Sequence, residues 1–139
     1  MRMPVRRITI AVLAVTLAAC ASAAPPPPPA TTIPITSFQM VAGKWAGPII
    51  GLASKGRDES DWIEVTIRED GTYDFGVART IGMFAGKGQF AMKDGKLTSR
   101  SERGSAEYSL TERDGRQYLR VDGVGENDRK VTADLTRAR

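Results

Sequence analysis

Few side chains in this sequence could carry out acid–base, nucleophilic or metal chemistry. The chain of 139 residues contains no histidine and a single cysteine, Cys20. It therefore lacks the atoms for a histidine general base, for a cysteine–histidine metal site and for a disulfide within one chain. Hydrolysis by two acids needs a facing pair with separated pKa values, and the carboxylates here fall mostly at expected turns or solvent-facing positions. We expect no enzymatic activity, no cofactor and no metal site.

The setting of Cys20 is the most specific chemical signal in the chain. Three arginines lie within the first seven residues, and an apolar run follows over residues 8–19. This run has the length of a signal-peptide core and is shorter than the ~20 residues of a membrane-spanning helix. It ends in Leu17-Ala18-Ala19-Cys20, which resembles the lipobox of bacterial lipoproteins. The resemblance implies cleavage before Cys20, diacylglycerol on its thiol and a fatty acid on its new amino group.

The same resemblance implies a location. In enteric lipoproteins an aspartate directly after the cysteine favours the inner membrane, whereas this chain has Ala21. The resemblance therefore implies the periplasmic face of the outer membrane, provided that the host is Gram-negative. An ordinary secretory peptide cleaved near Ala24 is the alternative. We assign residues 1–19 to the signal peptide and 20–35 to the lipidated cysteine and a linker, in which Pro25 to Pro29 favour a stiff polyproline II stalk.

Residues 36–139 are predicted to form a β-domain. Apolar and polar side chains alternate in many short runs, as from Trp62 to Arg68, which is typical of strands with one buried face. Asp70-Gly71, Asp94-Gly95 and Asp114-Gly115 separate such runs and favour tight hairpins. We expect an all-β fold, a small antiparallel up-and-down meander β-barrel of about eight strands, because closure hides the apolar face and the sheet edges. An open curved meander or a two-sheet sandwich is the alternative.

The first expected strand opens with Gly43-Lys44-Trp45. This segment resembles the Gly-X-Trp opening of lipocalin-like (calycin-type) and avidin-like barrels. The resemblance implies that Trp45 closes one end of the barrel and that Arg137 or Arg139, from the last strand, packs across it by a cation–π contact. The chain is shorter than typical lipocalins and lacks an avidin-like set of biotin-contacting tryptophans, so the resemblance implies no particular ligand.

One set of large side chains could either line a ligand pocket inside the barrel or fill its core. The set is Trp45, Tyr73, Phe75, Phe90, Met92, Tyr108 and Leu110.

We expect a non-catalytic, periplasm-facing lipoprotein that is attached to the membrane through Cys20 and binds a small apolar molecule or envelope lipid in its barrel. The alternative is a protein-binding module, either an accessory subunit of an envelope complex or an inhibitor of a hydrolase. A hollow barrel favours the first function, whereas a filled core with an exposed apolar patch favours the second. We expect no nucleic-acid partner, because basic and acidic residues nearly balance beyond Cys20.

Overall fold

A computed structural model describes residues 28–52, 61–79 and 82–139. The expected signal peptide, Cys20 and most of the expected stalk lie outside these ranges. Regular structure within them consists of β-strands and two short 3-10 turns, Phe38–Met40 and Glu126–Asp128. Within the same ranges, no helix has the length and apolar character needed to cross a membrane. The prediction of an all-β fold is confirmed.

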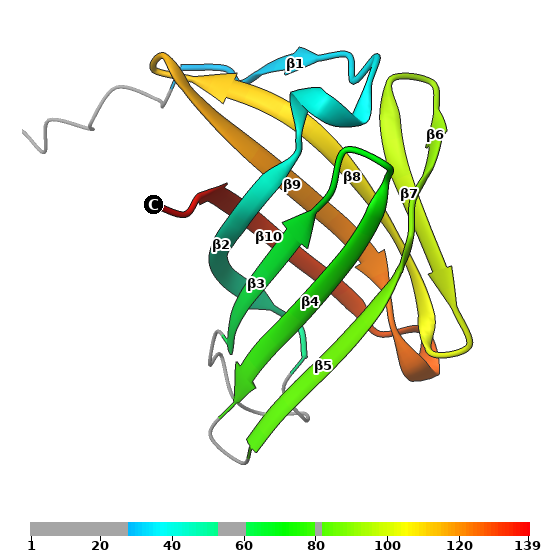
Figure 1. Cartoon of the computed structure of the whole chain (residues 1–139). Coiled ribbons are helices and arrows are strands. Elements are labelled where there is room, and N and C mark those ends of the chain that lie inside the picture. The colour runs from blue at the N-terminus through cyan, green and yellow to red at the C-terminus, as the bar shows by residue number, and fades with distance from the viewer. Residues whose placement is uncertain (1–27, 53–60, 80–81) are drawn as a thin grey trace, which may run out of the picture.

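The strands form one antiparallel, 10-stranded sheet (Figure 1). They are β1 (Thr31–Ile33), β2 (Gly43–Ile50), β3 (Asp61–Ile67), β4 (Thr72–Arg79), β5 (Gly82–Gln89), β6 (Ala91–Lys93), β7 (Lys96–Ser101), β8 (Gly104–Arg113), β9 (Arg116–Val124) and β10 (Lys130–Arg137). Neighbours follow the order β5-β4-β3-β2-β10-β9-β8-β7-β6, and β1 adds to β8.

The two ends of this order are joined by one continuous run of chain. Only Phe90 separates β5 from β6. The first part of the run pairs with β4 and the second part pairs with β7. The sheet therefore curls around until its ends meet at Phe90, and the predicted up-and-down meander takes the form of a curled, incompletely closed barrel.

Strand pairing closes the barrel along only part of the length of β5 and β7. β6 pairs with Lys96, Leu97 and Thr98, whereas the rest of β7 pairs only with β8. On the other side, β5 pairs only with β4. Among the described residues no strand pairing joins Gly82–Gln89 to Ser99–Ser101, and we call these two unpaired edges the open seam. Figure 1 shows β5 diverging from β7 along it.

The hydrophobic core lies on the inner face of the curled sheet. Its cluster of buried apolar side chains draws members from β2, β3, β4 and β7 to β10. Ile35 and Val41, which flank the 3-10 turn at Phe38–Met40, are also buried in it. β1 pairs with β8 within the range that the sequence assigned to the linker. The segment before β2 thus packs onto the barrel.

The hairpin turns show why aspartate–glycine pairs were informative. Asp94-Gly95 has φ values of 51° and 73°, and Asp114-Gly115 has 54° and 71°. These left-handed values match the expected two-residue turns, whose twist suits the flanking strands. Asp70-Gly71 differs, because the Arg68 amide donates to the Thr72 carbonyl at 2.9 Å and so encloses three residues. Such longer hairpins place one left-handed residue before the second strand, here Gly71 with φ 84°.

Two strands, β2 and β5, have sequence patterns that are irregular for local reasons. The alternation fades in β5 because Gly86 and Gly88 stand at inward positions, where the rings of Phe75 and Tyr73 cover them. β2 continues through Pro48 although proline has no amide hydrogen to donate. Its pairing with β10 accordingly has partners at Ala46 and Ile49 but none between them.

Candidate functional site

The side chains that the sequence proposed for a pocket or a core occupy three kinds of place. Those that are buried in the core cluster are Trp45, Tyr73, Phe90, Tyr108 and Leu110. Phe75 is half-buried and packs against that cluster. Met92, on β6, is exposed. The geometry therefore brings most of these residues together as packed interior.

Trp45 closes the end of the barrel that faces the segment before β2. Its indole Nε1 donates a hydrogen bond of 2.7 Å to the Val41 carbonyl. The Arg137 guanidinium lies 4.5 Å from the ring centroid and donates to the carbonyls of Ala42 at 2.8 Å and Met40 at 2.7 Å. Of the two arginines that the sequence put forward, Arg137 makes the contact with Trp45. This cluster joins the first and last long strands of the barrel.

An aromatic cluster packs in the interior between β4, β8 and the crossing at Phe90. The Tyr73 and Phe90 rings stack with centroids 4.2 Å apart, and Tyr108 meets the edge of Phe90 at 4.8 Å. Burial raises the pKa of Tyr108 to about 12, and a hydrogen bond with the Ser99 side chain opposes that rise. Tyr108 is therefore neutral at physiological pH and serves the packing rather than proton transfer.

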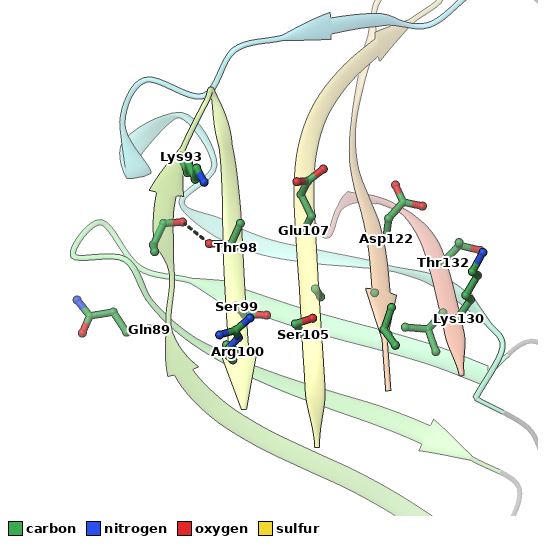
Figure 2. Close-up of a pocket in the computed structure, with 15 residues that line it drawn as sticks. Gln89, Lys93, Thr98, Ser99, Arg100, Ser105, Glu107, Asp122, Lys130 and Thr132 are labelled. Carbon is green, nitrogen blue, oxygen red and sulfur yellow. Dashed lines mark hydrogen bonds between the residues drawn. The ribbon is translucent and has the colours of Figure 1, made fainter. Parts of the chain in front are cut away.

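The outer face of the sheet carries a hollow of about 750 Å³ across β6 to β10 (Figure 2). Thr98, Glu107, Asp122 and Thr132 form a cross-strand row within it, each opposite the next in register. Figure 2 shows these polar side chains on one face of the strands. This hollow lies outside the barrel interior in which the sequence placed an apolar ligand.

The two acidic side chains of this hollow have neighbouring cations. Glu107 and Asp122 stand opposite each other, yet Lys96 Nζ lies 2.6 Å from Glu107 Oε1 and Arg120 Nε lies 3.2 Å from Asp122 Oδ2. The hydrogen bond with Glu107 raises the pKa of Lys96, and that with Asp122 raises the pKa of Arg120. Across the described ranges, no group of three metal-ligating side chains is placed to hold an ion. The acidic side chains of the hollow and their cations are best explained as exposed cross-strand ion pairs that stabilise the sheet.

Apolar side chains gather instead on the outer face of β2 to β5. Pro48, Trp62, Ala78 and Met83 are opposite one another in register on four successive strands, and all are exposed. Ile50 lies two residues beyond Pro48 on the same face of β2. We call these five residues the apolar row. Trp62 is 50% exposed, Ile50 61% and Met83 82%.

Sequence reasoning missed this row. The alternation from Trp62 to Arg68 placed Trp62 on the face expected to meet solvent, and a tryptophan at such a position is a signal that could have marked it. Met83 was missed because the sequence favoured a connection over residues 81–86, where β5 begins, and a row across four strands is visible only when their registers are known.

Comparison of the chain with protein-family models, with curated proteins and with solved structures found no match. The function must therefore be argued from the geometry.

Proposed function

We propose that this chain is a non-catalytic, lipid-anchored envelope protein that binds another protein through the apolar row. The exposure of Trp62, Met83 and Ile50 on adjoining strands carries the proposal. Large apolar side chains rarely gather on the free surface of a soluble monomer, and a contiguous group marks an interaction site. Tryptophan is also enriched among the residues that dominate binding energy at protein interfaces.

The interior gives less support to binding of a small apolar molecule. Most of the side chains proposed for a pocket are buried against one another, with ring centroids 4.2 Å and 4.8 Å apart. Interiors at such spacing resemble packed organic crystals rather than hollow vessels. Of the two functions left open by the sequence, the protein-binding module is the better supported.

The placement of the row suits a partner in the periplasm. Ile50 ends β2, Trp62 lies near the start of β3 and Met83 lies near the start of β5. The chain enters the domain at β1. In Figure 1 these strand ends lie at the opposite end of the barrel. If the linker tethers the domain by its β1 end to lipid at Cys20, the row faces away from the outer membrane. Attachment and location rest on the lipobox resemblance.

The test is site-specific photo-cross-linking in living bacteria. A photoreactive residue replaces Met83 in the full-length chain, and the matched control places it at Lys93, which is also exposed but lies on β6. We expect discrete protein adducts from position 83, loss of these adducts in the Trp62→Glu variant, and no such adducts from position 93. Equal adducts at both positions would contradict the proposal. So would a reproducible small-molecule mass on the intact protein in native mass spectrometry, combined with no adduct at position 83.

A further inference from the structure

The open seam offers backbone hydrogen-bonding groups that lack strand partners. In an antiparallel strand, groups that do not face the one neighbour point to the other side. β5 pairs only with β4, and its far edge makes no hydrogen bond to another described residue. The strand spans eight residues, from Gly82 to Gln89. It is long enough to serve as a template for an added strand.

Side chains on both faces of β5 are incompletely covered at the seam. Met83 points outward as the last member of the apolar row. Phe84 points inward and is only half-buried, with its ring 5.5 Å from that of Phe75. An added strand beside β5 would extend the apolar row on one face and cover Phe84 on the other, because successive residues of a strand alternate between faces.

The seam also carries three cations with weak or no ion pairs, although Lys87 lies opposite Asp74 in the register of β4 and β5. Lys87 on β5 and Arg100 on β7 are exposed and form no ion pair with another described residue. Arg103, in the β7–β8 turn, reaches across the seam with its guanidinium 5.3 Å from the Phe84 ring centroid. Its nearest carboxylate oxygen, on Glu126, is 4.0 Å away, and both side chains are about two-thirds exposed. Such a contact contributes little.

We propose that the open seam binds an extended, acidic segment of the partner protein, which pairs with β5 as an added strand. The inference rests on the proposed function and names the kind of partner that the apolar row meets. Apolar residues of the segment would contact Phe84 or continue the apolar row, and its carboxylates would meet Lys87, Arg100 and Arg103. A second copy of this chain fits less well, because it would bring the same cations to the seam.

The experiment uses the full-length chain and a defined probe. The probe is an end-blocked peptide of alternating valine and glutamate, as long as β5. We expect the peptide to slow hydrogen exchange of amides in Gly82–Gln89 by about tenfold and to leave the middle of β8 and β9 unchanged. Lys87→Glu should weaken peptide binding by about fivefold at low salt, whereas Lys93→Glu, on β6, should not change it.

Two control peptides separate backbone pairing from charge. A valine–glutamate peptide with methylated backbone nitrogens keeps its carboxylates but cannot form the ladder, and a valine–lysine peptide keeps the ladder but reverses the charge. Unchanged exchange in β5, or equal binding of the methylated peptide, would overturn strand addition. Adducts at position 83 without protection of β5 would overturn strand addition alone, whereas protection of β5 without adducts at position 83 would overturn the role of the apolar row.

Discussion

At the scale of residues, the two tryptophans form a matched pair with opposite environments. Trp45 is fully buried under Arg137, whereas Trp62 is 50% exposed in the apolar row. Trp45→Ala should lower the free energy of unfolding by about 3–5 kcal/mol, because it leaves a cavity and removes the donor to Val41. Trp62→Ala should cost less than about 1 kcal/mol. Urea unfolding followed by circular dichroism measures both, and similar losses would contradict this assignment of roles.

Tyr108 should make the free energy of unfolding decrease at alkaline pH. Its pKa rises from 10.0 to about 12 because burial disfavours the phenolate. Between these values the unfolded chain has released this proton while the folded chain still holds it, so stability is present below pH 10 and falls as the pH rises. The loss should approach about 3 kcal/mol.

Tyr108→Phe isolates this contribution from the other groups that titrate at alkaline pH. The difference in unfolding free energy between the parent and the variant should shrink or reverse between pH 9 and pH 12. Unfolding curves at several pH values provide the measurement. A constant difference across this range would show that Tyr108 ionises as easily in the folded as in the unfolded state.

At the scale of elements, the packing of β5 depends on glycines, because rings from β4 occupy the space that larger side chains of β5 would need. A Cβ at Gly88 would lie 2.7 Å from the Tyr73 hydroxyl, and Tyr73 is held by its stack on Phe90. Gly88→Ala should therefore cost about 1–3 kcal/mol. Gly76, on β4, has nothing within 4 Å of such a Cβ, so Gly76→Ala should be neutral or raise stability by up to about 1 kcal/mol. Thermal unfolding compares the two, and an equal response would mean that the Tyr73 ring moves freely.

The same glycines explain why some strands could be predicted from the sequence and β5 could not. Strands with an alternating inner face, such as β3 and β9, and turns such as Asp94-Gly95 could be predicted because their signals are local. β5 could not, since its inward positions are filled by rings from β4 that appear elsewhere in the sequence. The apolar row was missed for the same reason, because Trp62, Ala78 and Met83 come from three strands whose register the sequence does not state.

At the scale of the whole molecule, the barrel is closed at one end and open along its side. Trp45, Arg137 and the segment before β2 cover one end, and the single crossing at Phe90 joins the sheet ends. Toward the other end β5 and β7 separate, and the apolar row lies beside that seam. The packed barrel thus places an exposed apolar face and an unpaired strand edge next to each other, an arrangement suited to adding a strand from a partner.

The orientation of that arrangement depends on the anchor. Beyond Cys20 the chain carries 17 basic and 16 acidic residues, so attraction to anionic lipid is weak and the proposed attachment would depend on acyl chains. Cys20→Ala should therefore move the protein from the membrane fraction to the soluble periplasmic fraction, while Ser22→Ala should leave it membrane-bound. Cross-links at position 83 should weaken in the Cys20→Ala variant if the partner is itself held at the envelope, because the anchor raises the local concentration of the two proteins. A Cys20→Ala protein that still sediments with membranes would refute the lipid anchor and, with it, the orientation proposed for the apolar row.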